Sequence, residues 1–112
     1  MAALRAMRIM EMTPQTVAAT IAPVLERYPV ERAWLFGSVA RGDQQRGSDI
    51  DLIVELDGDA HLGLGFMDLE ADLVRALRHA VDVRTLDRQR STRAFLSNFD
   101  HERVLVYERA SR

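Results

Sequence analysis

Apolar side chains recur every three or four residues in three parts of the chain, which is the spacing of one face of an α-helix. The first helix is expected over residues 13–28, where a threonine cap is followed by a proline at the first helical position. Pro23 lies inside this stretch and predicts a kink or a break near Ala22, because proline removes a backbone hydrogen bond. The clearest amphipathic pattern predicts a helix over 66–80, and a weaker pattern predicts one over 92–99.

Shorter apolar runs, rich in β-branched and aromatic residues or alternating with polar ones, lie between these helices and predict strands. They span residues 32–36, 49–56 and 81–83, and a last run at 104–107 predicts a short strand or a helix turn. Turns that contain glycine or aspartate separate several of these runs. Strands that alternate with helices are typical of an α/β (α+β) domain.

One compact domain is expected for 112 residues, since this length supports a modest core and leaves no room for a second domain. We expect that domain to span residues 13–112. Residues 1–12 have weak periodicity and several methionines, so they are expected to form a flexible segment without the features of a secretion signal. No apolar run approaches the ~20 residues that a membrane span needs, so no membrane partner is expected.

The composition, with 47% apolar and 29% charged residues, is ordinary for a globular protein, and Trp34 and Met67 are expected in its core. A net charge of -2 argues against a general nucleic-acid-binding protein, which usually carries a basic excess. The absence of cysteine excludes disulfides and thiolate metal sites and favours a cytoplasmic location. All 15 basic residues are arginine, so any triphosphate must be held by arginine, backbone amides and metal.

The stretch from Trp34 to Val54 combines an apolar run, a polar loop with glycine, and a second apolar run that carries two aspartates. Side chains two residues apart in a strand point to the same face, so Asp49 and Asp51 are expected to lie together. The apolar residues that alternate with them are expected to point into the core: Ile50, Leu52 and Val54. Two neighbouring carboxylates repel each other unless a cation lies between them. The pattern therefore predicts a metal site.

Gly37-Ser38, followed after ten residues by Asp49-x-Asp51, resembles the signature of the nucleotidyltransferases related to DNA polymerase beta. The fuller string, Phe36 to Gly42 leading to Ser48-Asp49-Ile50-Asp51-Leu52, is similar to the single-domain branch called minimal nucleotidyltransferases. Each pair of residues alone is a weak signal, but the combination at this spacing between two apolar runs is a strong one. The resemblance covers roughly residues 30–107. It implies the polymerase beta-like fold, a small mixed sheet flanked by helices.

The chemistry of this family needs carboxylates that hold metal ions. Nucleotidyl transfer is an in-line attack on the α-phosphate of a nucleoside triphosphate, and two Mg²⁺ ions roughly 3.5–4 Å apart stabilise the charge that develops. By resemblance, Asp49 and Asp51 hold both ions, while Asp82 supplies the third acid, which binds the catalytic ion and helps to deprotonate the nucleophile. Without metal the three carboxylates repel one another, so at least one is expected to have a raised pKa. Other candidates for the third acid lie in predicted turns: Asp57, Asp59 and Asp87.

Four further residues are candidates for binding the nucleotide. Gly37 would let the backbone approach the phosphates without a Cβ atom in the way, and Ser38 would offer a hydroxyl and an amide to the β- or γ-phosphate. Arg41 either clamps the triphosphate or is a surface residue paired with Asp43. Ser48 either donates a hydrogen bond to a phosphate or only starts the strand.

The resemblance implies an enzyme that transfers AMP from ATP with the help of Mg²⁺. Larger relatives carry a second domain for the acceptor, so a chain of this size is expected to use the surface of a partner. In the minimal branch that partner is a HEPN protein, an RNase toxin, and transfer of AMP to one of its tyrosines makes the nucleotidyltransferase its antitoxin. Two alternatives are an antitoxin that neutralises the toxin by binding alone, and a nucleotidyltransferase that acts on a small molecule or an RNA end.

Overall fold

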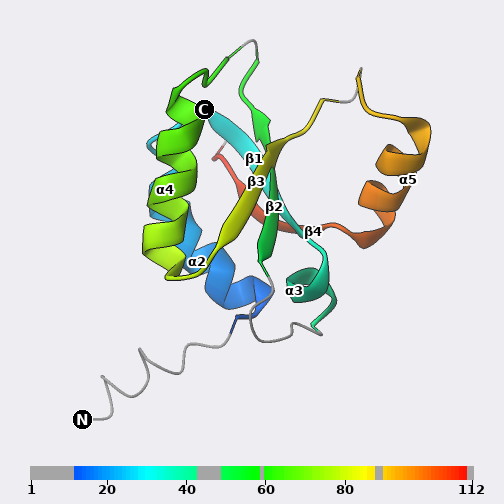
Figure 1. Cartoon of the computed structure of the whole chain (residues 1–112), viewed down its shortest axis with the longest axis horizontal. Helices are drawn as coiled ribbons and strands as arrows, with labels where there is room; N and C mark the ends of the chain where they lie inside the picture. The colour runs from blue at the N-terminus through cyan, green and yellow to red at the C-terminus, as the bar shows by residue number, and fades with distance from the viewer. Residues whose placement is uncertain (1–11, 43–48, 59, 88–89, 111–112) are drawn as a thin grey trace.

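The chain folds into a four-stranded mixed sheet with helices on both faces (Figure 1). The computed structural model describes most of the chain, namely residues 12–42, 49–58, 60–87 and 90–110. In the order in which they lie side by side, the strands are β3 (Val81–Thr85), β2 (Ile50–Leu56), β1 (Val30–Phe36) and β4 (Val104–Glu108). β1 pairs antiparallel with β2 and β4, whereas β3 lies parallel to β2. This architecture confirms the predicted α/β class with a small mixed sheet.

The main hydrophobic core lies between the sheet and two helices, α2 (Pro14–Leu25) and α4 (Gly65–Leu77), which cover the same face (Figure 1). All four strands contribute buried residues to this core. α4 is also the connection that brings the chain back for β3, since parallel neighbours cannot be joined by a tight turn. No helix within the described ranges has the length and apolarity that crossing a membrane requires.

The first helix, α2, begins as predicted. The Thr13 side chain accepts a hydrogen bond from the Thr16 backbone N–H at 3.2 Å, and the Thr16 hydroxyl accepts one from the Thr13 N–H at 3.0 Å. A kink or a break was predicted near Ala22, and the break is wrong because the helix continues through Pro23 to Leu25. Pro23 lies in the last turn of the helix, where it removes one intrahelical hydrogen bond close to the end of the element.

The long helix, α4, differs from the sequence prediction in the burial of Met67 and in the residue at which it ends. Its buried residues, Leu69, Leu73 and Leu77, belong to the predicted apolar stripe, but Met67 lies outside that stripe and is 72% exposed. The prediction that Met67 belongs to the core is therefore wrong. The helix also ends at Leu77, earlier than predicted, because Arg78 adopts the left-handed conformation that terminates helices.

The second face of the sheet carries a smaller cluster under α5 (Arg93–Glu102). Phe99 of α5 is fully buried and packs edge to face against Trp34, with 5.4 Å between ring centroids. The guanidinium of Arg103 lies 5.5 Å from the centroid of the Trp34 ring, in cation–π geometry. Trp34 is therefore buried, as predicted, but on the face opposite to the main core. We call this the open face, the face on which Arg32, Trp34 and Ile53 lie.

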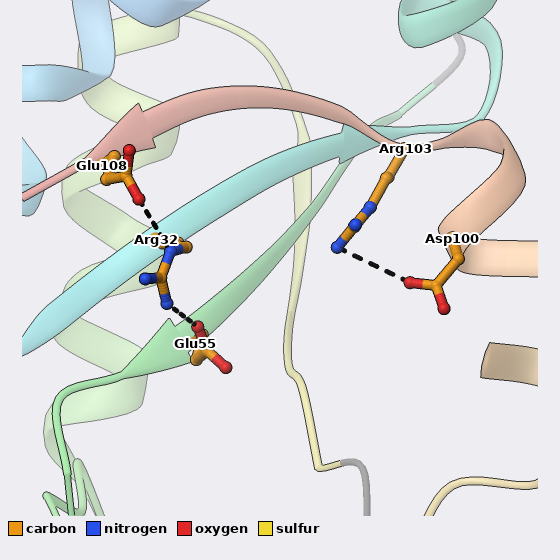
Figure 2. A network of polar contacts seen from close by, with 5 residues as sticks. All are labelled: Arg32, Glu55, Asp100, Arg103 and Glu108. Atoms are coloured by element: carbon orange, nitrogen blue, oxygen red, sulfur yellow. Dashed lines mark hydrogen bonds and ion pairs between the residues drawn. The ribbon is translucent and has the colours of Figure 1, made fainter.

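Arg32 of β1 links three strands on the open face through side-chain hydrogen bonds to β2 and β4 (Figure 2). Its Nε donates to Glu108 Oε2 of β4 at 2.9 Å, and its Nη1 donates to Glu55 Oε1 of β2 at 2.7 Å. Nearby, Arg103 lies 3.6 Å from Asp100 of α5 (Figure 2). Both arginines at this part of the face are therefore engaged by acids other than the aspartates of the predicted site.

Candidate active site

Asp51 and Asp82 lie side by side on the open face, on the parallel strands β2 and β3. The strand register pairs their Cα atoms directly. Residues paired in this way point to the same face of a sheet. Their neighbours along each strand are buried in the main core on the other face: Ile50, Leu52, Val81 and Val83. The structure thus brings together two of the three aspartates to which metal binding is assigned by resemblance.

Asp49 lies just before β2 and is exposed to solvent. Its charge contributes to the raised pKa of Asp51, so the two carboxyl groups are close enough to interact. Among the residues that the structure describes, no three His, Cys, Asp or Glu side chains are placed to hold a metal ion together. The three predicted metal ligands therefore form a pair, Asp51 and Asp82, with the Asp49 carboxylate near it. Their role in metal binding stays a prediction.

The pKa of Asp51 is raised above its ordinary value of 3.8. Burial is the largest cause, because surroundings of low polarity disfavour the charged carboxylate. The charge of Asp82 raises the pKa further and that of Asp49 adds to it, while Arg84 and Arg41 act in the opposite direction. The direction agrees with the expected mutual repulsion of the aspartates, but burial is the largest single cause.

Asp82 is paired with an arginine of its own strand. Arg84 Nη2 donates to Asp82 Oδ2 at 3.0 Å, and the Arg84 side chain is 66% exposed. Because residues two apart in a strand share a face, Arg84 also belongs to the open face. Arg84 was missed because the predicted strand ended at Val83, whereas β3 continues to Thr85. The signal that could have found it is its spacing of two from Asp82.

Gly37 lies against the Asp51 carboxylate from the end of β1. Its φ of +78° is a conformation that side chains with a Cβ atom rarely adopt. A Cβ atom built on Gly37 would lie 2.5 Å from Asp51 Oδ2, well inside van der Waals contact. The backbone conformation therefore favours glycine here, and a side chain at this position would displace the Asp51 carboxylate. The predicted approach of phosphates to Gly37 stays a prediction.

The other candidates for nucleotide binding are only partly located. Ser38 is the first residue of α3 (Ser38–Arg41), the short helix after β1. Arg41 Nη1 lies 4.0 Å from Glu102 Oε2 of α5, so an acid of that helix is one partner of Arg41. Ser48 and Asp43 lie outside the described residues. The roles of Ser38, Arg41 and Ser48 in nucleotide binding stay predictions.

The alternative third acids are placed differently from Asp82. Asp57 and Asp87 follow the ends of β2 and β3, at the opposite end of these strands from Asp82. The carboxylate of Asp87 accepts a hydrogen bond from the backbone N–H of Arg90 at 3.1 Å, a role typical of aspartate in turns. Asp59 lies outside the described residues. The register therefore favours Asp82 as the acid that accompanies Asp51.

A pocket of ≈ 130 Å³ adjoins the two carboxylates. It is lined by acidic, basic and apolar residues of β1, β2, β3 and α5: Phe36, Asp51, Leu52, Ile53, Asp82, Arg84 and Phe95. Carboxylates, a guanidinium and aromatic rings thus meet in one depression on the open face. Such a site offers ligands to a hard cation and a donor to an anionic group.

Solved structures with the same fold come from toxin–antitoxin complexes. A crystal structure of a toxin–antitoxin with AMP-PNP superposes with a TM-score of 0.67 at 22% identity, over 82% of this chain and 73% of that chain. A complex of the tri-AMPylated HEPN toxin of Shewanella oneidensis with its MNT antitoxin gives a TM-score of 0.61 at 18% identity, over 87% and 74% of the two chains. At these identities the likeness shows the fold.

Sequence comparison identifies the family. The chain is 42% identical over 65 residues to the proposed protein adenylyltransferase MJ0435 of Methanocaldococcus jannaschii, over 58% of this chain and 69% of that protein. The family model described as polymerase beta, nucleotidyltransferase matches residues 19–112, which is most of the chain. The chain therefore belongs to the polymerase beta nucleotidyltransferase family.

Proposed function

We propose that this nucleotidyltransferase transfers AMP from ATP to a tyrosine of a HEPN RNase toxin and thereby acts as its antitoxin. The observation that carries the proposal is the pair Asp51 and Asp82, in register on the open face and with Gly37 against one carboxylate. A protein acceptor is supported by the identity to a relative named as a protein adenylyltransferase. The HEPN acceptor is supported by the shared fold with a complex of a tri-AMPylated HEPN toxin and an MNT antitoxin.

The carboxylates of the site fit Mg²⁺, which proteins usually bind through one or two carboxylates together with substrate phosphates. Asp51 and Asp82 would hold the ion, with Asp49 as a further ligand. Burial and neighbouring acids disfavour the charged form of Asp51, and a divalent cation would favour that form. When bound, Mg²⁺ would stabilise the negative charge that builds on the phosphoryl oxygens and on the leaving pyrophosphate.

The side chains of the site would orient the reaction. The tyrosine oxygen attacks the α-phosphorus and forms a P–O bond, while the bond from the α-phosphorus to the bridging oxygen breaks and pyrophosphate leaves. Asp82 would accept the proton of the tyrosine hydroxyl, as the resemblance implies. Because Gly37 has no Cβ atom, the Asp51 carboxylate can stay in its position without a steric clash. The acceptor must approach the open face, because α2 and α4 cover the other face (Figure 1).

The test is transfer of label from ATP to the partner. The purified chain, incubated with a HEPN protein encoded beside its gene, Mg²⁺ and ATP labelled at the α-phosphate, is expected to label that protein. Asp51→Asn should abolish the label, whereas Asp57→Asn removes a carboxylate at the other end of β2 and should leave labelling unchanged. A folded wild-type chain that transfers no label would refute the proposal. If a chain with Asp49→Asn and Asp51→Asn still protects cells from the toxin, binding alone suffices.

A further inference from the structure

The ion pair between Arg84 and Asp82 occupies one of the three carboxylates that the proposed reaction uses. We propose that Arg84 is a triphosphate-binding residue that exchanges partners. Without nucleotide its guanidinium pairs with Asp82, and with nucleotide it donates to phosphate oxygens instead, which frees the Asp82 carboxylate for the divalent cation. This inference rests on the proposed function, since it assumes that the site binds a nucleoside triphosphate together with a metal ion.

The position of Arg84 permits this exchange. It follows Asp82 by two residues on β3, so both side chains project from the open face. Arg84 lines the same pocket as Asp51 and Asp82. Its side chain is 66% exposed, so the guanidinium can turn from the carboxylate toward a ligand in the pocket without breaking core packing.

The charge of the site gives a cation from the chain a role beside the metal ion. Two carboxylates repel an incoming triphosphate, and no lysine is available to offset them. The charges of Arg84 and Arg41 both act on Asp51, and Arg41 lies beside Glu102. The planar guanidinium of arginine matches two phosphate oxygens at once, and this charge-assisted pairing is stronger than an ordinary hydrogen bond.

The exchange also costs little. An ion pair between exposed side chains contributes little to stability, because water screens the charges and two side chains must be ordered. The alternative interpretation is that Arg84 and Asp82 form such a pair and nothing more. The two interpretations differ in one measurable way. Removal of Arg84 frees the Asp82 carboxylate for metal under either interpretation, but only a partner exchange makes it weaken nucleotide binding as well.

The experiment measures both affinities on the full chain. Binding of Mn²⁺ alone is followed by electron paramagnetic resonance, and binding of AMP-PNP in Mg²⁺ by calorimetry. Arg84→Ala is expected to bind Mn²⁺ about three- to fivefold more tightly, because the competing cation is gone. It is expected to bind AMP-PNP about tenfold more weakly, because a charge-assisted phosphate contact is lost. Arg84→Lys, which keeps the charge but not the planar fork, should bind AMP-PNP with intermediate affinity.

The matched control is Arg75→Ala, which removes another exposed arginine paired with an aspartate, 3.2 Å from Asp72 on α4. It should change neither affinity, and the melting temperature of each variant confirms folding. Unchanged affinities in Arg84→Ala, or both affinities weakened together, would overturn the partner exchange. A wild type that binds AMP-PNP in Mg²⁺ but labels no acceptor would refute the proposed function and leave this inference intact. A wild type that binds no AMP-PNP would overturn both.

Discussion

Replacing Gly37 with alanine tests whether the turn after β1 leaves room for the Asp51 carboxylate. Gly37 has a φ of +78°, and an added Cβ atom would lie 2.5 Å from Asp51 Oδ2. Gly42 offers a matched control, because its φ is +77° and an added Cβ atom would meet nothing within 4 Å. The two substitutions therefore share the cost of the backbone conformation and differ in the contact with the carboxylate.

The expected effects separate stability from activity. The left-handed conformation costs a residue with a Cβ atom roughly 1–2 kcal/mol, so each variant should lose about that much stability. The Asp51 carboxyl is the end of a rotatable side chain, so it can relieve the clash in Gly37→Ala by moving about 1 Å, from 2.5 Å to an ordinary contact of 3.4 Å or more. A displacement of that size at a reacting centre lowers rates by about a hundredfold.

Urea unfolding and initial rates of AMP transfer to the HEPN protein measure the two effects. We expect both variants to be destabilised alike, Gly37→Ala to lose about a hundredfold in rate, and Gly42→Ala to stay near the wild-type rate. Rates are compared where both variants are fully folded. If Gly37→Ala transfers AMP as fast as Gly42→Ala, the reasoning that glycine is needed to position the carboxylate is refuted.

Two further predictions concern the metal-free fold. Between its ordinary pKa of 3.8 and its raised pKa in the folded chain, Asp51 binds more protons in the folded state than in the unfolded state, so this group lowers stability as pH rises through that window. The Asp51→Asn variant does not lose this stability. In EDTA near neutral pH its melting temperature should therefore be no lower than that of the wild type, and a clearly lower melting temperature would contradict this. Phe99 is fully buried against Trp34, so Phe99→Ala should cost about 3–5 kcal/mol in urea unfolding and shift the tryptophan emission to the red. An unshifted emission maximum would show that Phe99 does not shield the indole.

The local patterns of the chain predicted whether most elements are helices or strands. They also predicted which face of β2 carries Asp51. Alternation along 49–56 predicted that Asp51 faces away from Ile50 and Leu52, and the burial of these two residues confirms it. A period of two is a property of any extended backbone, so it can be read without knowing the strand's neighbours. Local patterns failed where packing against another segment decides whether a side chain is buried. Met67 is the example, since it lies beside the core-facing stripe of α4.

The contacts that make the site came only from the tertiary structure. The parallel pairing of β2 with β3 places Asp82 opposite Asp51, and the end of β1 brings Gly37 against the same carboxylate. Resemblance to a family suggested Asp82, but no spacing in the chain specifies that register. The length of β3, which places Arg84 beside Asp82, was decided by the pairing of β3 with β2. Strand order and register depend on hydrogen bonds and burial between distant segments. The sequence therefore determined which side chains share a face, and only folding decided which of them meet.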